Sequence, residues 1–256
     1  MKTASIAEIK KNLSEITISD HEYVKSLRQD SRSGVQAALK QFDRKIEKQA
    51  ALVRKLQEMS LFENQAYDEG HQVIAGTDEV GRGPLAGPVI SAAVVLPKDC
   101  DILGLNDSKQ LSEAKRDQLF DEINEKAVAI GIGVVDQSEI DAINIYQASK
   151  KAMMLAIEEL VVQPDFLLVD AMTLPTQIKQ QSLIKGDARS ISIAAASIIA
   201  KVTRDRLMKE YSVVYPYYGF ERNAGYGTKE HLHALQTHGI TPIHRLTFAP
   251  VKNYIK

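Results

Sequence analysis

The chain has 256 residues, and its 32 lysines and arginines against 33 aspartates and glutamates give a formal net charge of −1. Its composition, 44% hydrophobic and 25% charged, excludes collagenous and disordered classes, and a single cysteine excludes a disulfide framework and a multi-thiolate zinc site. The near-neutral total weakens, without removing, the case for a polyanionic partner.

No membrane or export signal stands out along the chain. The apolar runs fall short of the roughly 18 residues that suggest a membrane span, and the first residues mix charges with isolated apolar side chains. One cysteine fits a reducing compartment. We therefore expect a cytoplasmic protein that contacts no membrane.

Residues 1–70 are predicted to form a helical extension. Apolar residues recur three, four or seven positions apart between Val35 and Leu56, and a shorter pattern runs from Ile6 to Leu13. These spacings predict a helical hairpin whose apolar stripe packs on the main domain. As an alternative, six basic against three acidic side chains between residues 40 and 58 could help to hold a polyanion.

Residues 71–256 have the pattern of a mixed α/β domain. Short apolar runs predict strands over 72–76, 89–96, 128–135 and 165–169, and residues 182–185 are a candidate fifth strand. Helical patterns cover 144–162 and 190–211. Strand pairs with short links, followed by a helical crossover, indicate a mixed sheet covered by helices.

Acidic side chains follow two of the predicted strands. Asp78 and Glu79 enter a segment, residues 76–88, that holds four of the 14 glycines, and Asp170 ends another apolar run. Asp187 stands before the helix that Ser190 can cap. If the two strands are neighbours, Asp78 and Asp170 lie side by side. Close carboxylates repel one another unless cations neutralise them, which favours Mg²⁺ or Mn²⁺, although each acid alone is typical of a cap or a surface charge.

The later part of the chain adds polar side chains that suit a nucleic acid. Ser197, Lys201 and Arg204 are spaced to share one helix face, which fits a phosphate backbone or simply a solvated stripe. Tyr226 between two glycines can present its ring to a base or sugar, or mark a turn with a packing ring. The C-terminal histidines lack zinc-ligand spacing, so solvated or capping roles are expected for them.

Several motifs occur in an order that points to one family. They are Gly76–Val89, Asn106–Lys109, Leu168–Asp170, Lys185–Asp187, the helix from Ala194 to Lys201, and Gly225–Thr228. Together they resemble the bacterial type 2 ribonucleases H, ribonuclease HII. The resemblance implies a ribonuclease-H-like fold, a mixed five-stranded sheet flanked by helices, with the helical extension of residues 1–70 before a catalytic domain of residues 71–256 that ends in C-terminal helices.

The resemblance also implies roles for individual residues. Asp78, Glu79, Asp170 and Asp187 correspond to a four-carboxylate site for two Mg²⁺ or Mn²⁺ ions. Gly81, Arg82 and Gly83 correspond to the group that reads the ribose 2′-hydroxyl, and Tyr226 to a ring that stacks on the following sugar. Phosphate contacts are implied for Lys109, Ser197 and Lys201. The type 3 enzymes lack this Gly-Arg-Gly and carry Glu at the position of Asp170.

The implied activity is hydrolysis of the phosphodiester 5′ of a ribonucleotide, in RNA/DNA hybrids or at single ribonucleotides embedded in duplex DNA. The products would be a 3′-hydroxyl and a 5′-phosphate. The implied biological role is the removal of misincorporated ribonucleotides and RNA primers. Two alternatives stay open: a non-catalytic nucleic-acid-binding protein of the same fold, and a metal-dependent DNA nuclease. We expect a monomer; a replication-clamp contact is a hypothesis that no motif here supports.

The net charge is an average over unlike segments. Residues 71–184 carry eight more acidic than basic side chains, and residues 185–256 carry six more basic than acidic ones. A metal-dependent nuclease needs both signs, so the total of −1 says little about the partner. For the extension, we hypothesise that it strengthens duplex binding.

Overall fold

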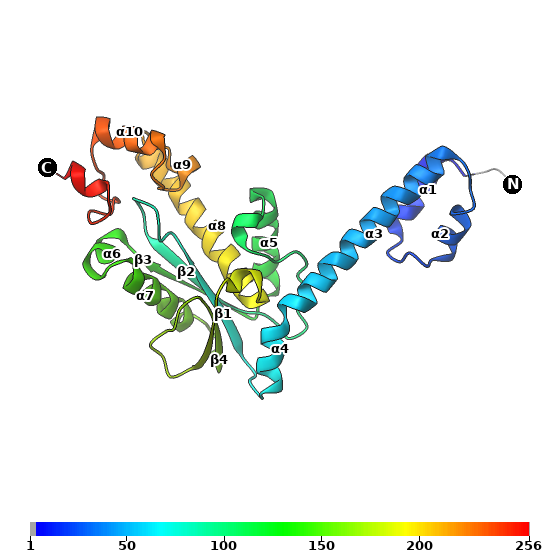
Figure 1. The fold of residues 1–256 in the computed structure, drawn as a ribbon, viewed down its shortest axis with the longest axis horizontal. Helices are drawn as coiled ribbons and strands as arrows, with labels where there is room; N and C mark the ends of the chain where they lie inside the picture. Colours follow the sequence, from blue (N-terminus) through cyan, green and yellow to red (C-terminus); the bar gives the residue numbers. More distant parts are fainter. Residues whose placement is uncertain (1–3, 256) are drawn as a thin grey trace. The chain divides into compact units, whose positions relative to one another are not determined.

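The computed structural model describes residues 4–255, and the chain folds into two compact units. We call Met1–Gln57 the N-terminal unit and Glu58–Lys256 the C-terminal unit. Figure 1 gives the order of the elements along the chain. Within the described residues, no helix combines the length and apolarity that crossing a membrane requires. The division that we predict after residue 70 stays a prediction.

The N-terminal unit is built from helices that share a small apolar core. These helices are α1 (Ile6–Glu15), α2 (Glu22–Leu27) and α3 (Ser33–Met59), and Ser5 caps α1 by accepting the N–H of Glu8. The core joins Ile9, Leu13, Val24, Leu27, Val35, Leu39 and Phe42. The predicted helices are confirmed, but α2 is too short for periodicity to find. The first half of the α3 stripe packs inside this unit, where we had expected it to cover the main domain.

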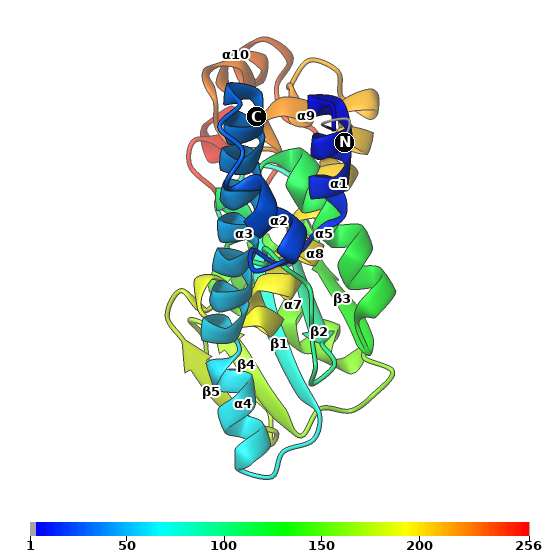
Figure 2. The same cartoon turned by 90° about the vertical axis from the view of Figure 1, so that its right-hand side faces the viewer.

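The C-terminal unit contains the predicted mixed sheet. Its strands are β1 (Ile74–Val80), β2 (Val89–Val95), β3 (Ala129–Val135), β4 (Phe166–Asp170) and β5 (Lys179–Leu183). Their order is β3-β2-β1-β4-β5, which Figure 2 displays, with β4 parallel to both of its neighbours and the β1–β2 and β2–β3 pairs antiparallel. The expected five-stranded mixed sheet flanked by helices is confirmed.

Two long helices cover the faces of this sheet. Ala75 and Leu167 cluster with side chains of α7 (Ile145–Glu158), whereas their sequence neighbours Ile74 and Leu168 cluster with Ile193 of α8 (Ile191–Val214). Because successive strand residues point to opposite faces, α7 and α8 lie on opposite sides (Figure 1). At Gly76 an added Cβ would lie 2.2 Å from the backbone of Ser192, so glycine lets α8 approach β1 closely.

The helix α4 (Leu61–Asp68) packs against the α8 face through Ala66. Its Glu63 is 4% exposed and accepts hydrogen bonds from the Ser190 hydroxyl (2.5 Å) and the Ser192 N–H (3.0 Å). Burial raises the pKa of Glu63, and these bonds oppose the rise. The carboxyl thus fastens α4 to the first turn of α8.

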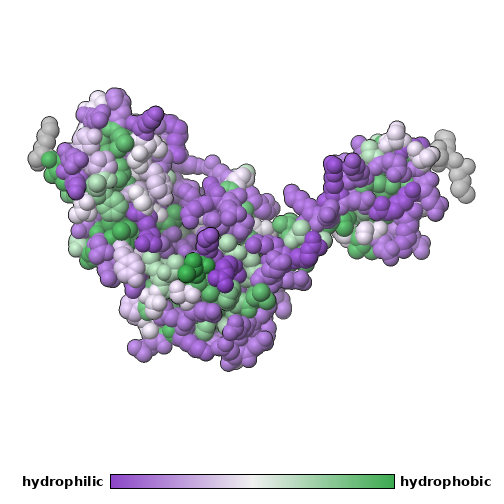
Figure 3. All heavy atoms as spheres, in the orientation of Figure 1, coloured by the Kyte–Doolittle hydropathy of each residue, from purple (hydrophilic) through white to green (hydrophobic). Residues whose placement is uncertain are grey.

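The remaining elements complete the C-terminal unit. They are α5 (Glu113–Lys126), α6 (Gln137–Ile143), α9 (Phe220–Asn223), α10 (Lys229–His238) and the short 3-10 helices η1 (Ser108–Gln110), η2 (Gly186–Ala188) and η3 (Val251–Tyr254). The predicted C-terminal helices are therefore present. We missed α5, which buries only Leu119 and Ile123, and placed β5 three residues late because most of it is polar. On the face drawn in Figure 3, hydrophilic areas surround smaller hydrophobic patches.

Candidate active site

Two predicted acids lie at neighbouring positions on adjacent strands of the sheet, Asp78 within β1 and Asp170 at the end of β4. Strands β1 and β4 pair in parallel, with Thr77 beside Val169, so Asp78 and Asp170 follow at neighbouring positions. The prediction that their strands are neighbours is confirmed. Asp187 comes from η2, and the Gly186 N–H donates to Asp170 Oδ1 at 2.6 Å, which ties η2 to the end of β4. One edge of the sheet therefore gathers residues more than a hundred positions apart.

Burial and mutual repulsion disfavour the charged form of these acids. Asp78 is 5% exposed, and burial, followed by the charges of Glu79 and Asp170, raises its pKa well above the usual range. Burial raises the pKa of Glu79 to about 7, although Arg82, whose Nη1 lies 3.3 Å from Glu79 Oε1, opposes the rise. Burial also leads the upward pKa shifts of Asp170 and Asp187. Divalent cations would relieve this repulsion.

The donor set fits a hard divalent cation, but the side chains are not arranged as a finished metal site. Oε2 of Glu79 is buried and has no hydrogen-bond partner among the described residues, which leaves it free for a cation. However, over residues 4–255 no three Asp, Glu, His or Cys side chains lie close enough together to hold a metal ion. Asp78 and Asp170 each direct one oxygen to a backbone N–H, of Glu79 (2.7 Å) and Gly186 respectively.

A lysine and a further acid flank these carboxylates. Lys109 Nζ lies 4.0 Å from Asp187 Oδ2, and its side chain is 76% exposed. Burial lowers the pKa of Lys109, but Asp78, Asp107 and Asp187 raise it by more. Asp107, which we did not select from the sequence, faces Asp187 and raises the pKa of that group. The place of Asp107 in the Asn106–Lys109 motif could have indicated that it lies near the site.

The helix α8 brings Ser197 to the acids but does not present the whole predicted phosphate-binding face. Ser197 is 4% exposed, hydrogen-bonds to Ser108 (2.9 Å), and lowers the pKa of Asp78. Lys201 pairs with Asp205 at 2.7 Å. Arg204, expected on the same face, is fully buried instead, because α8 turns that side toward the loop after β1. The expectation for Arg204 was wrong.

The glycine-rich loop and Tyr226 lie side by side. At Gly83 an added Cβ would be 3.3 Å from Cε1 of the Tyr226 ring, which is itself 45% exposed. Gly81 has φ +94°, a conformation that favours glycine. The Leu85 N–H donates to Gly225 O at 2.8 Å and joins the two segments. The loop and the ring therefore form one partly exposed surface beside Glu79.

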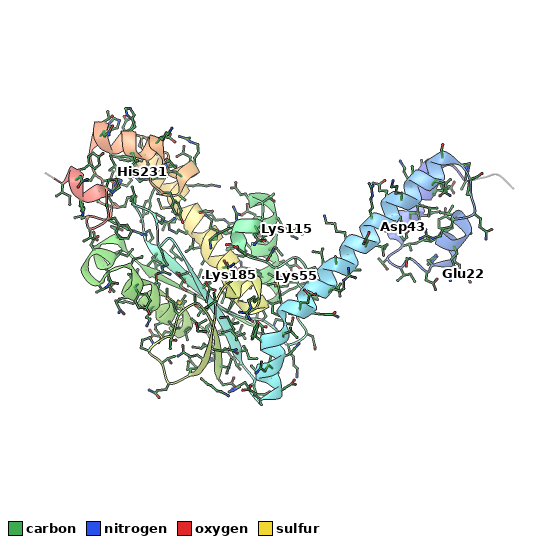
Figure 4. The ribbon with its side chains drawn as sticks, viewed as in Figure 1. Glu22, Asp43, Lys55, Lys115, Lys185 and His231 are labelled. Carbon is green, nitrogen blue, oxygen red and sulfur yellow. The ribbon has the colours of Figure 1, made fainter. Side chains whose placement is uncertain are left out.

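Two C-terminal histidines are buried, which contradicts the solvated role expected for them. His231, on α10 in Figure 4, and His244 are buried, with their Nε2 atoms 2.9 Å apart. The Nδ1 atom of His231 lies 3.0 Å from the carbonyl oxygen of Tyr226. The Nδ1 atom of His244 accepts from the Thr241 N–H (2.9 Å), so the pair links α10 to a segment 13 positions further along the chain. These roles replace the solvated ones that we expected.

Two family models match the chain, "Ribonuclease HII" over residues 75–251 and "Ribonuclease HII N-terminal domain" over residues 5–67. The chain is 60% identical over 255 residues to the curated ribonuclease HII of Enterococcus faecalis, with all of both chains covered. The match to the ribonuclease HII of Bacillus subtilis is 52% over 254 residues, covering 99% of this chain and 100% of that one.

Solved structures share the fold of the C-terminal unit. The ribonuclease H2 of Pyrococcus horikoshii matches with a TM-score of 0.62 and 27% identity, over 72% of this chain and 97% of that chain. A complex of PCNA with RNase HII from Archaeoglobus fulgidus (TM-score 0.57, 24% identity, 69% and 95% covered) supports the fold alone. So does Bst-RNase HIII in complex with Mn²⁺ (TM-score 0.55, 19% identity, 71% and 68% covered).

Proposed function

The chain belongs to the ribonuclease HII family and is a ribonuclease H endonuclease, and from this premise we propose the bond that it cuts. The enzyme hydrolyses the phosphodiester on the 5′ side of a ribonucleotide, in an RNA/DNA hybrid or at one ribonucleotide within duplex DNA. It leaves a 3′-hydroxyl and a 5′-phosphate. One observation carries the proposal: the buried carboxylates lie next to a glycine-rich loop that contacts an exposed tyrosine.

Asp78, Glu79, Asp170 and Asp187 are the residues proposed to hold the metal ions. Two divalent cations, Mg²⁺ or Mn²⁺, would supply activation of water and stabilisation of the leaving 3′-oxygen. Glu79 offers a buried oxygen that has no partner among residues 4–255, and the other three acids offer oxygen ligands of the hard type that these cations prefer. The His231–His244 pair is occupied with structural hydrogen bonds, so neither of these histidines is assigned a proton-transfer role.

The proposed substrate contacts combine the family motifs with the exposure of Arg82, Gly83 and Tyr226. Gly81, Arg82 and Gly83 are proposed to read the 2′-hydroxyl, which is the group that separates RNA from DNA at one nucleotide. Tyr226 is proposed to stack on the next sugar, since its ring is adjacent to Gly83 and partly exposed. Lys109 is the most accessible of the proposed phosphate contacts; Lys201 would first have to leave Asp205, and Ser197 to leave Ser108.

Matched duplexes test the proposal directly. Purified protein with Mn²⁺ or Mg²⁺ is incubated with duplex DNA, with the same duplex containing one ribonucleotide, and with an RNA/DNA hybrid, and product ends are mapped. We expect cuts 5′ of ribonucleotides only, and none with Asp78→Asn. Asp121→Asn, a change at an exposed aspartate, is the matched control and should cut normally.

The outcomes separate the alternatives. Cleavage of all-DNA duplex at a similar rate would instead indicate a metal-dependent DNA nuclease. Binding without cleavage would indicate a non-catalytic protein, and wild-type rates for Asp78→Asn would remove the proposed metal site.

Further proposals concern the biological role, the oligomeric state, the location and the partners of the enzyme. We propose that the enzyme removes misincorporated ribonucleotides and RNA primers, acts as a monomer and works in the cytoplasm. The Archaeoglobus fulgidus protein was solved in complex with PCNA. A binding assay between this chain and the sliding clamp of its own source organism would test for a similar contact. We also propose that the N-terminal unit strengthens duplex binding.

A further inference from the structure

Two arginines are fully buried and have no carboxylate partner among the residues that the structure describes. Arg204 of α8 and Arg245 are both 0% exposed. Buried arginines are normally paired with an acid. In the part of the chain that the structure describes, however, every hydrogen bond from these two guanidinium groups goes to a backbone carbonyl. Burial lowers the pKa of Arg204 to about 10 and that of Arg245 to about 9, so both remain charged at neutral pH.

The acceptors are concentrated in the loop between β1 and β2. Arg245 donates to the carbonyls of Gly81 (2.5 Å), Arg82 (3.0 Å) and Gly87 (2.8 and 3.0 Å). Arg204 donates to the carbonyls of Ala86 (3.1 Å) and Pro88 (2.9 Å). The two arginines thus hydrogen-bond to both ends of the loop from its buried side.

Arg204 also reaches the segment before Tyr226. Its Nη1 donates to Ala224 O at 2.8 Å, while an added Cβ at Gly81 would lie only 2.3 Å from its Nε. One guanidinium is therefore in contact with the loop that carries Gly81 and with the turn that leads to Tyr226. Arg204 fixes these two segments relative to each other.

The direction of the carbonyls determines the direction of the neighbouring N–H groups. In a trans peptide the C=O of one residue and the N–H of the next point to opposite sides. Because the carbonyls of Gly81 and Arg82 point at Arg245, the N–H groups of Arg82 and Gly83 point away from it. Neither N–H donates a hydrogen bond to another described residue. The loop therefore presents two adjacent donors on its outer side.

We propose that Arg204 and Arg245 are positioning residues for ribose recognition: they hold the loop so that the N–H groups of Arg82 and Gly83 meet the 2′-oxygen beside Tyr226. This inference rests on the proposed function. The two buried charges, placed behind the loop, also favour an electron-rich oxygen in front of it. Neither arginine touches the substrate, and both act through the backbone that they orient.

The test compares binding of two duplexes by full-length protein. Fluorescence anisotropy in EDTA gives the dissociation constants of an all-DNA duplex and of the same duplex with one ribonucleotide. Wild type should prefer the second. Arg245→Lys keeps the charge but loses the forked donor geometry, so the preference should fall roughly tenfold, or to none, while affinity for all-DNA duplex stays within about twofold. Arg206→Lys, a change at an exposed arginine on α8, should alter neither value.

The outcomes distinguish this inference from its premise. A folded Arg245→Lys with the wild-type preference, or with equal weakening toward both duplexes, overturns the positioning role. If wild type itself neither prefers nor cuts the ribonucleotide duplex, the proposed function fails first.

Two further measurements keep the inference open to refutation if Arg245→Lys does not fold. Arg204→Lys is read by the same criteria. In wild type, amide exchange measured by NMR should be fast at Arg82 and Gly83, and slow only when the ribonucleotide duplex is added. Protection of these two amides in the free protein would overturn the proposal.

Discussion

Acidification should destabilise the C-terminal unit through His244. The Thr241 N–H donates to its Nδ1, so the proton of the neutral ring sits on Nε2 and is donated to Nε2 of His231. His231 then donates its Nδ1–H to Tyr226 O. Protonating Nδ1 of His244 would set two donors against each other in a buried site, because the Thr241 N–H already points there. Both rings are therefore neutral in the folded protein.

The magnitude follows from the pKa of His244. Burial, together with the nearby His231, lowers it from 6.5 to about 4. Between these values the unfolded chain binds more protons than the folded one, so stability is fully present above pH 6.5 and is lost as the pH falls toward 4. At ~1.4 kcal/mol for each pH unit, this interval corresponds to about 3 kcal/mol of unfolding free energy.

Urea denaturation at a series of pH values measures this loss. His244→Gln keeps a donor near the position of Nε2 but does not titrate, and it leaves the Thr241 N–H without its acceptor. We expect it to be less stable at pH 7 by about 1–3 kcal/mol. It should then lose about 3 kcal/mol less than wild type between pH 7 and pH 4. His233→Gln, at an exposed position, serves as the control with an unchanged slope.

A His244→Gln variant that loses stability with falling pH as steeply as wild type would refute the reasoning. The acid loss would then come from other groups, and the neutral histidine pair would have no measurable part in it.

Three other predictions concern separate parts of the chain. Glu79→Gln removes a buried carboxylate with an unpartnered oxygen, so it should raise the melting temperature of metal-free protein at pH 8 while abolishing cleavage. Glu63→Ala leaves the Ser192 N–H without its acceptor and should lower the unfolding free energy, measured in urea, by about 1–3 kcal/mol. Changing Lys40, Arg44 and Lys48 of α3 together to Glu should raise KM in the cleavage assay more than it lowers kcat, and unchanged kinetics would exclude a duplex contact there.

The spacing of apolar residues along the chain predicted most of the buried strands. The apolar runs located β2, β3 and β4 because buried strands must be apolar. The run at 72–76 found only the start of β1, which continues through the polar residues Thr77, Asp78 and Glu79 to Val80, and the adjacency of β1 and β4 followed from topology. Strand β5 was displaced because an exposed, polar strand has little periodicity.

The supports of the candidate site could not be predicted in the same way. Arg245 contacts a carbonyl 164 positions away, and nothing near either residue signals the contact. The spacing of Arg204 placed it with Ser197 and Lys201 but could not show that this part of the helix is covered. A histidine is likewise assigned a buried role only when its partner is known: His231 and His244 lie 13 positions apart, and nothing in their spacing indicates the contact.

The buried arginines also set an order of events during synthesis. A ribosome completes the β1–β2 loop long before it reaches residue 204, and it reaches residue 245 later still. The acids of β1 and β4 can therefore come together on a nascent chain whose loop still lacks both guanidinium groups. Discrimination between ribose and deoxyribose would be acquired after the carboxylates have come together, and a chain truncated just before residue 245 would carry its carboxylates without it.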